Sequence, residues 1–328
     1  MEITGKVLVT GGDGFIGSHL VEYLLQCGYQ VRALTYYNSF NYWGHLEEFY
    51  KDYSGQLEVV SGDIRDPGIC EKICEEIEIV FHLAALIPIP YSYIAPHSYV
   101  QTNVEGTLNM LTSALKNKVR RFVHTSTSEV YGTAKYRPID ENHPLNPQSP
   151  YAATKLGADK LAISFYLSFG LEVVVVRPFN TYGPRQSARA VIPTVILQAL
   201  KSNEIYLGNV DTSRDFNYVS DTVEGIVLAG LQDTFIGQEI NIGSGKAYKI
   251  IEIVDMISEI LGKELKVRTD PDRIRPEKSE VKILLCSSEK IRKICNWQPK
   301  VSIQEGLKKT VEWFKRHQRA YKSDIYNV

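Results

Sequence analysis

The chain has 328 residues, 44% of them hydrophobic and 23% charged, which is the ordinary balance of a globular enzyme. Its 37 lysines and arginines against 38 acids leave a net charge of -1, so no overall field draws it to nucleic acid or to an anionic membrane. The apolar runs are too short to span a bilayer, and the first strand begins too early to leave room for a signal peptide. We therefore expect a cytoplasmic protein.

Short, continuously apolar runs predict the strands of a parallel sheet that is buried on both faces. Between these runs lie amphipathic stretches, the first of which places Ile16, Leu20 and Leu24 on one stripe that would face the sheet. This alternation of strand and helix indicates a Rossmann-type, doubly wound α/β fold. The expected strands are residues 7–10, 30–34, 57–60, 79–83, 122–126 and 173–176.

The first strand runs directly into a glycine motif, Gly-Gly-Asp-Gly-Phe-Ile-Gly at residues 11–17, which opens the first helix. Gly11 permits the tight turn, Gly14 lets the backbone approach a pyrophosphate, and Gly17 lets helix and strand pack closely. The N-terminus of the helix would donate its N–H groups to the phosphates. Because a strand precedes the motif and a helix follows it, the motif predicts dinucleotide binding.

The second strand of such a fold usually ends in an acid that accepts the ribose hydroxyls of NAD. Here Thr35 stands at that place, with no carboxylate to demand NAD and no adjacent arginine to demand NADP. We prefer NAD slightly and leave NADP open. Asp63, at the end of the third strand, has two interpretations: it accepts the adenine amino group, or it forms a turn or helix cap.

The five cysteines predict no metal site. Cys70 and Cys74 lie one helical turn apart, but no histidine or second cysteine pair accompanies them. We interpret the cysteines as buried free thiols of a reducing compartment.

Polar groups follow the strand at 122–126, where Thr127, Ser128 and Glu129 would face the ligand crevice at the C-terminal edge of the sheet. Further on, Tyr151 and Lys155 lie four residues apart and so would share one helix face. A free phenol, with a pKa of about 10, is a poor base at neutral pH. A nearby ammonium and a positive nicotinamide ring would favour the phenolate.

The pattern of predicted elements changes after Pro178, where prolines divide the chain into shorter elements. Helical patterns cover 191–202, 250–262 and 303–317, and the highly charged stretch 263–283 is interpreted as a solvated loop. We expect a cofactor-binding domain at residues 1–180. A smaller α/β substrate-binding domain at residues 181–328 would cover the C-terminal edge of the sheet, with some exchange of chain between the two.

The glycine motif, Thr127, Tyr151 and Lys155 come in the order and spacing of extended short-chain dehydrogenase/reductases. The chain resembles that family, the NAD-dependent epimerases and dehydratases, over nearly its full length. The resemblance implies that the three polar residues oxidise a sugar alcohol with a tightly bound, recycled NAD or NADP. It assigns to the cofactor Gly11, Gly14, Phe15, Ile16, Gly17, Thr35, Asp63, Ile64, Leu83, Ala84, Ala85, Tyr151 and Lys155.

The residues after the strand-end hydroxyl separate the reactions of this family. Nucleotide-sugar 4,6-dehydratases have Thr-Asp-Glu-Val-Tyr-Gly there, whereas 4-epimerases have small or neutral residues. This chain has Thr-Ser-Glu-Val-Tyr-Gly at 127–132, so it keeps the glutamate and replaces the aspartate by Ser128. The resemblance implies that C4 is oxidised first, that Glu129 then removes the C5 proton, and that the C6 hydroxyl leaves as water.

The missing aspartate leaves the outcome of the reaction open. The usual aspartate protonates the departing hydroxyl, and Ser128 is far too weak an acid for that, so Glu129 or a water would do so. Hydride return to C6 gives a 4-keto-6-deoxy sugar, which we favour, and return to C4 gives a 5,6-ene sugar. A 4-epimerase with an idle Glu129 is the enzymatic alternative. A cofactor-sensing protein would be expected to lack Tyr151 or Lys155.

Residues 177–184 match the family's entry to its substrate domain. By resemblance, Asn180 would contact a substrate phosphate, and Arg214 and Arg275 would clamp the diphosphate with guanidinium forks. The expected substrate-binding residues are Pro88, Thr127, Asn180, Arg189, Arg214 and Arg275.

Four stretches narrow the resemblance to the N-acetylglucosamine nucleotide dehydratases of legionaminic and pseudaminic acid pathways: residues 37–41, 87–93, 126–132 and 185–190. They do not distinguish UDP from GDP. The helical patterns near 98–117 and 151–168 carry extra apolar residues, and relatives pair these two helices, so the resemblance also predicts a homodimer.

Overall fold

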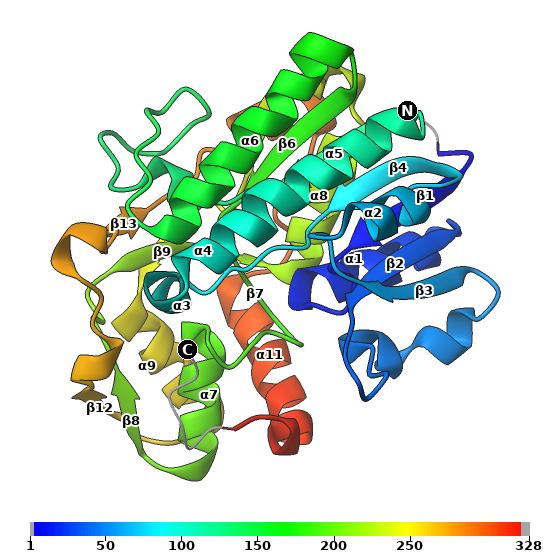
Figure 1. The fold of residues 1–328 in the computed structure, drawn as a ribbon. Coiled ribbons are helices and arrows are strands. Elements are labelled where there is room, and N and C mark those ends of the chain that lie inside the picture. The colour runs from blue at the N-terminus through cyan, green and yellow to red at the C-terminus, as the bar shows by residue number, and fades with distance from the viewer. Residues whose placement is uncertain (1–2, 323–328) are drawn as a thin grey trace.

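A seven-stranded parallel sheet lies at the centre of the larger lobe in the computed structural model, which describes residues 3–322 (Figure 1). Its strand order is β10-β6-β5-β4-β1-β2-β3. The six predicted strands are confirmed, and β10 joins them from the second half of the chain. The strands are β1 (Lys6–Thr10), β2 (Val31–Tyr36), β3 (Leu57–Gly62), β4 (Ile77–His82), β5 (Arg121–Thr125), β6 (Glu172–Pro178) and β10 (Gln238–Ile242).

The chain runs outward from β1 to β3 and then crosses back to β4 on the other side of β1. This reversal opens a crevice outside the carboxyl ends of β1 and β4, where ligands of doubly wound sheets bind. Because β10 pairs with β6, the large sheet contains residues beyond position 180. The domain boundary at residue 180 stays a prediction.

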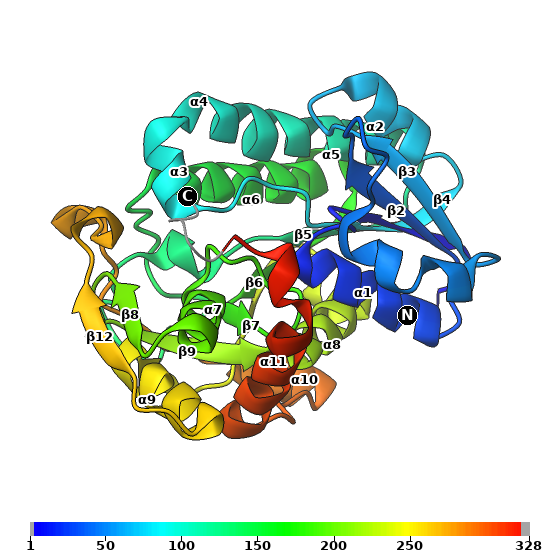
Figure 2. The ribbon, with the colours of Figure 1, turned by 90° about the horizontal axis from the view of Figure 1, so that it is seen from below.

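Helices cover both faces of the sheet (Figure 2). Neighbouring strand residues alternate between the two faces, with Phe122 packed in one core cluster and Val123 in the other. One face carries α2 (Pro67–Ile73), α5 (Gly106–Lys116) and α6 (Pro150–Phe169), and the other carries α1 (Phe15–Gln26) and α8 (Val219–Leu231). This arrangement confirms the doubly wound fold.

Local signals set the ends of α6, the helix that carries Tyr151 and Lys155. The Ser149 side chain accepts the N–H of Ala152, and Pro150 occupies the first turn, where its missing N–H costs nothing. Gly170, with φ of 72°, ends the helix in a left-handed conformation. Beside α6, α3 (Ile89–Ile94), α4 (Pro96–Tyr99) and a π-helical turn at Val100–Glu105 lead into α5.

The smaller lobe is built around two small sheets, which lie beside α7, α9 and α11 in Figure 1. The three predicted helices are confirmed as α7 (Val191–Lys201), α9 (Ile250–Leu261) and α11 (Ile303–His317), and α10 (Glu289–Cys295) is added. In one sheet β9 (Ser213–Tyr218) pairs with β7 (Asn180–Tyr182), β11 (Ala247–Lys249) and β13 (Ile283–Leu284), and in the other β8 (Glu204–Leu207) pairs with β12 (Lys266–Thr269).

The interpretation of 263–283 as a loop is wrong at β12, which pairs in parallel with β8. Only Val267 of β12 packs against the core, and its other residues are exposed. A four-residue edge strand with one apolar residue shows no clear alternation of apolar and polar residues, so the sequence pattern did not predict it.

Within residues 3–322, no helix combines the length and the apolar character that a bilayer crossing requires. The same part of the chain contains no group of three histidine, cysteine or acidic side chains placed to hold a metal ion. The five cysteines form no disulfide, and Cys27 is exposed rather than buried.

Candidate active site

The glycine motif forms a cradle between β1 and α1. Gly11 has a φ of 69°, and a Cβ there would lie 3.0 Å from the Ala84 nitrogen at the end of β4. A Cβ on Gly17 would overlap the Gly11 carbonyl oxygen. Both positions therefore require glycine, as the motif predicts.

The N-terminus of α1 has the properties of a phosphate site. Gly14 is its N-cap and offers no side-chain hydrogen bond, and the first turn, which begins with Phe15 and Ile16, holds no acid. A Cβ on Gly14 would meet only the Gly11 carbonyl oxygen, at 3.3 Å, so the backbone here is otherwise open. Unpaired N–H groups at the positive end of a helix suit a pyrophosphate, so these residues fit a dinucleotide.

The neighbouring strand ends complete this edge of the crevice. The Thr10 hydroxyl accepts the N–H groups of Leu83 and Ala84, both at 3.1 Å, which fixes the segment after β4 that continues through Ala85. Thr35 is buried, and its hydroxyl pairs with Ser61 at 3.1 Å. Thr35 therefore supplies no carboxylate at the end of β2.

Asp63 forms a turn, which was one of its two interpretations. Its carboxylate accepts the Arg65 N–H at 2.9 Å and the Arg65 guanidinium, whose hydrogen bond is the main reason that the pKa of Asp63 is lowered. The helix cap is Asp66, which accepts the Ile69 N–H at 3.0 Å, so the cap role for Asp63 is wrong. Ile64 is buried against Gly106, and contact of Asp63 with adenine stays a prediction.

Thr127, Tyr151 and Lys155 come together beneath the C-terminal edge of the sheet, and all three are buried. The Lys155 ammonium donates to the Thr125 carbonyl at 2.7 Å. Burial lowers the pKa of Lys155 to about 8, although the charge of Asp159 acts in the opposite direction.

The pKa of Tyr151 is raised by burial, and only the hydrogen bond with Thr127 lowers it appreciably. The protein alone thus opposes the phenolate, whereas the expectation from the sequence was that the ammonium and the nicotinamide ring together would favour it. Burial disfavours a charged phenol more than the surrounding dipoles compensate. The lowering that a base needs would have to come from the charge of the nicotinamide ring.

A buried ionic cluster, which the sequence analysis missed, supports the catalytic helix. Asp159, one turn after Lys155, accepts hydrogen bonds from Ser126 at 2.8 Å and from Arg177 at 3.1 and 3.2 Å. His124 lies 3.3 Å from its other oxygen. Burial raises the pKa of Asp159. The effects of His124 and Arg177 lower it by more than burial raises it, so the pKa is lowered overall. The spacing of four residues from Lys155 is the signal that could have revealed Asp159.

Glu129 lies in a 3-10 turn at Ser128–Tyr131, whose N-cap is Thr127. Its charge raises the pKa of Tyr151 and also that of Arg214, so the carboxylate is within electrostatic reach of both groups. Burial nevertheless lowers the pKa of Arg214 overall. Ser128 is buried beside Glu129.

The two predicted clamp arginines meet at a third residue, Glu280, which the sequence analysis did not single out. One oxygen of Glu280 lies 3.3 Å from Arg214 Nη2 and 3.7 Å from Arg275 Nη1. Arg214 comes from β9 and Arg275 from the segment that precedes β13, so the fold brings them together over a long sequence separation. The two arginines with the single carboxylate of Glu280 leave an excess of positive charge, and the charge of Glu129 acts on Arg214.

The remaining predicted substrate residues surround this cluster in different ways. Asn180 begins β7, and its side-chain oxygen is buried without a hydrogen-bond partner. Pro88 caps α3, and its carbonyl accepts the Tyr99 hydroxyl at 2.5 Å. Arg189 is exposed. Burial raises the pKa of Tyr99, the charge of Arg189 offsets part of that rise, and the Tyr99 ring lies 6.3 Å from that of Tyr151.

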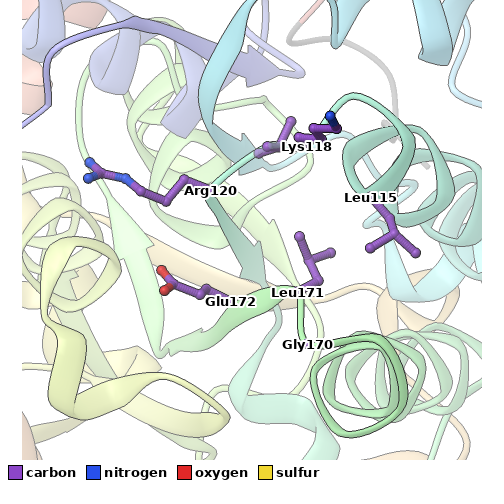
Figure 3. Close-up of a pocket in the computed structure, with 7 residues that line it drawn as sticks. Leu115, Lys118, Arg120, Gly170, Leu171 and Glu172 are labelled. Carbon is purple, nitrogen blue, oxygen red and sulfur yellow. The ribbon is translucent and has the colours of Figure 1, made fainter.

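A separate surface hollow lies at the opposite edge of the sheet. It has a volume of about 330 Å³ and is lined by residues such as Lys118, Leu171 and Glu172 at the amino ends of β5 and β6 (Figure 3). Since ligands of such sheets bind at the carboxyl ends of the strands, we do not assign it to the active site.

Comparison with known proteins agrees with this geometry. The family model of GDP-mannose 4,6-dehydratase matches residues 8–310. A dTDP-glucose 4,6-dehydratase of Actinoplanes sp. is 33% identical over 94% of this chain and 98% of its own. The structure of a dTDP-glucose 4,6-dehydratase of Streptomyces venezuelae with NAD bound is 31% identical, with a TM-score of 0.87 over 97% of this chain and 99% of that one.

An epimerase is similar to the same degree. The UDP-N-acetylglucosamine 4-epimerase of Methanobrevibacter ruminantium, solved with UDP-N-acetylmuramic acid, is 32% identical, with a TM-score of 0.85 over 96% of this chain and all of that one. Dehydratases and epimerases thus share the fold, and overall similarity does not separate the reactions. The chain belongs to the GDP-mannose 4,6-dehydratase family, a group of NAD-dependent nucleotide-sugar enzymes among the short-chain dehydrogenase/reductases.

Proposed function

We propose that this chain is an NAD-dependent dehydratase that converts UDP- or GDP-N-acetylglucosamine into the 4-keto-6-deoxy sugar. The observation that carries the proposal is the position of Glu129, within electrostatic reach of both the Tyr151 phenol and the Arg214 guanidinium. A carboxylate whose charge reaches both the proposed C4 base and the proposed diphosphate clamp can act on the sugar ring. An epimerase has no task for it.

The first task of the protein is to remove the C4 hydroxyl proton. Tyr151 accepts it, and Thr127 orients the phenol. Because the pKa of Lys155 is about 8, its ammonium form dominates at neutral pH, and this charge would add to that of the nicotinamide ring in favouring the phenolate. Bound NAD supplies the redox chemistry, since it can take a hydride from C4 and return it to C6.

The second task is the elimination. The C4 ketone acidifies the C5–H bond, and Glu129 takes that proton. With Ser128 in place of the usual acid, the protonated Glu129 then gives the proton to the C6 hydroxyl, which leaves as water. One carboxyl group thus carries both transfers: the first leaves an enolate, and the C5=C6 double bond forms as the hydroxyl leaves. When hydride is later added at C6, C5 takes a proton from solvent.

Ser128 also supports a second product. Without a dedicated acid beside Glu129, hydride return to C4 yields a 5,6-ene sugar instead, and this 5,6-dehydratase is our alternative. The epimerase alternative is supported by the similarity to the Methanobrevibacter enzyme. It requires that Glu129 be dispensable.

The diphosphate of the substrate would replace Glu280 as the partner of Arg214 and Arg275. Guanidinium groups bind phosphate oxygens in a bidentate manner. The guanidinium groups of Arg214 and Arg275 already share one carboxylate oxygen of Glu280. The buried side-chain oxygen of Asn180 has no hydrogen-bond donor, so it marks a polar position that a donor group of the substrate could satisfy. We assign Pro88 and Arg189 to the sugar side of the site, because both lie near Tyr99 and Tyr151.

Incubation with each nucleotide sugar in deuterated buffer, followed by NMR, tests the proposal. A new C6 methyl signal beside a C4 ketone or its hydrate supports the 4,6-dehydratase. Exocyclic vinyl protons with C4–H retained support the 5,6-dehydratase, and a C4 epimer alone refutes both. The nucleotide that reacts identifies UDP or GDP.

We also propose that the enzyme is a cytoplasmic homodimer that pairs through α5 and α6. Several apolar side chains on these helices are exposed, including Leu108, Leu167 and Phe169. Light scattering should give twice the chain mass of 37.1 kDa at micromolar concentration, and a monomer mass would contradict the proposal.

A further inference from the structure

Asp13, the third residue of the glycine motif, extends its carboxylate to the end of β2. Its Oδ2 accepts the N–H of Tyr36, the last residue of that strand, at 3.2 Å. Rossmann sheets usually place an acid at the end of β2 itself, where it accepts the adenosine ribose hydroxyls. In this chain Thr35 occupies that end, and its hydroxyl already pairs with Ser61. Asp13 is thus a carboxylate in the expected place that comes from a different element.

The segment after β2 holds Asp13 in position. Gly44, with a φ of 59°, lies so close that a Cβ there would be 2.5 Å from the Asp13 carbonyl oxygen. The His45 N–H donates to that oxygen at 3.3 Å. Asn38 closes the intervening loop, since its amide donates to the Tyr42 carbonyl at 2.7 Å and accepts the Tyr42 N–H at 3.1 Å. The segment after β2 therefore fixes the backbone of Asp13, and the Tyr36 N–H holds its carboxylate.

The carboxylate still has room for a ligand. Two backbone N–H groups donate to it, those of Tyr36 and of Asp13 itself. A carboxylate has about four lone-pair sites, so acceptor capacity remains. Burial raises the pKa of Asp13 despite these hydrogen bonds and the charge of His45, which means that the group is incompletely compensated and would gain from hydroxyl donors.

The neighbouring cation that could attract a 2′-phosphate is already occupied. Arg65 lies near the Tyr36 hydroxyl, but its guanidinium binds Asp63, with Nε at 3.0 and 2.9 Å from the two oxygens. A 2′-phosphate at the end of β2 would meet the charge of Asp13 and a neutralised arginine.

We propose that Asp13 takes the role of the missing β2 acid: it accepts the 2′-hydroxyl of the adenosine ribose and repels the 2′-phosphate, so that the enzyme selects NAD over NADP. This inference rests on the proposed function only in that it requires a dinucleotide cofactor. It is independent of which sugar reacts.

Calorimetric titration of the purified protein with NAD and with NADP, after removal of any retained nucleotide, tests the inference. The wild-type protein should bind NAD at least tenfold more tightly than NADP. Asp13→Asn keeps an oxygen for the Tyr36 N–H but loses the charge, and it should reduce this preference at least tenfold. Asp13→Ser should act in the same direction, and serves where Asn impairs folding. Asp52→Asn, which also exchanges a carboxylate for an amide but at an exposed position of the segment after β2, is the matched control and should leave the preference unchanged.

An unchanged NAD-to-NADP ratio in both folded Asp13 variants would overturn the inference, as would a wild-type preference for NADP or the failure of both dinucleotides to bind. The result separates from the proposed function, because the titration contains no sugar nucleotide. Tight, selective NAD binding without dehydration would refute the proposed function alone.

Discussion

The proposed cofactor end and the proposed sugar-nucleotide end of the site consist of different kinds of chemical group. The cofactor end is a backbone cradle, in which Gly11 and Gly17 permit contacts that any side chain would block. The sugar-nucleotide end is a cluster of charged side chains, in which Arg214 and Arg275 share Glu280. A backbone cradle is sensitive to added volume, whereas a cluster of guanidinium groups is sensitive to loss of charge. The substitutions below separate these two sensitivities, beginning with the buried ionic cluster around Asp159.

Asp159→Asn should have the largest effect on stability. It leaves the Arg177 guanidinium buried without its main counter-charge, which typically costs about 3–5 kcal/mol. Chemical denaturation measures this loss. Asp255→Asn, at an exposed position on α9, is the matched control and should cost less than about 0.5 kcal/mol. Similar unfolding free energies for the two variants would show that the cluster does not support the fold.

Gly17→Ala tests the sensitivity of the cradle to volume. The added methyl would overlap the Gly11 carbonyl, and overpacking of this kind costs about 1–3 kcal/mol. We expect a lower melting temperature and loss of NAD affinity in titration. Gly55→Ala adds the same methyl where no atom lies within 4 Å, and it should leave both quantities unchanged. Normal NAD affinity in the Gly17 variant would contradict the claim that this glycine cradle binds the cofactor.

Arg214→Ala tests the sensitivity of the other end to charge. Loss of a charge-assisted hydrogen bond to phosphate, worth about 1.5–3 kcal/mol, should raise the KM for the nucleotide sugar about tenfold to a hundredfold. The affinity for NAD should stay the same. Arg268→Ala removes an exposed arginine of β12 that pairs with Glu204, and its KM should match that of the wild type. Equal KM values for both variants would remove Arg214 from the clamp.

Lys155 gives a smaller, pH-dependent effect. Its pKa is about 8 in the folded protein and 10.5 when unperturbed, so the unfolded chain binds more protons between these values. The contribution of Lys155 to the unfolding free energy should therefore rise as the pH increases through this window, by about 1–2 kcal/mol between pH 8 and 9.5. Denaturation of the wild type and of Lys155→Met across this range isolates the effect. If the difference in unfolding free energy between the two proteins does not change with pH, the pKa of Lys155 is not lowered in the folded protein.

The same contrast explains what the sequence could predict. The cradle is local: strand, Gly11, Gly14, Gly17 and helix follow one another, so their order alone predicts the structure. Six strands of the large sheet could be predicted equally well, because buried parallel strands are continuously apolar. The seventh, β10, was not predicted, because it lies among the shorter elements of the second half of the chain. Tyr151 and Lys155 were found through their helical spacing.

The charged cluster is not local, and here the prediction was incomplete. Arg214 and Glu280 are 66 residues apart, and nothing in either local sequence shows that they pair. Asp159 was overlooked because its partners Ser126 and Arg177 come from other strands and loops. The position of Asp13 at the end of β2 likewise depends on a tertiary contact, with Tyr36.

The central claim is that Glu129 moves the C5 proton, and the most direct measurement is deuterium incorporation at C5 in Glu129→Gln, followed by NMR in deuterated buffer. Replacing the carboxyl group by an amide keeps the shape of the side chain and removes the base. We expect C5 exchange to fall about a hundredfold or more while NAD still binds, and the exposed Glu259→Gln on α9 to exchange like the wild type. Unchanged incorporation at C5 in Glu129→Gln would contradict the account.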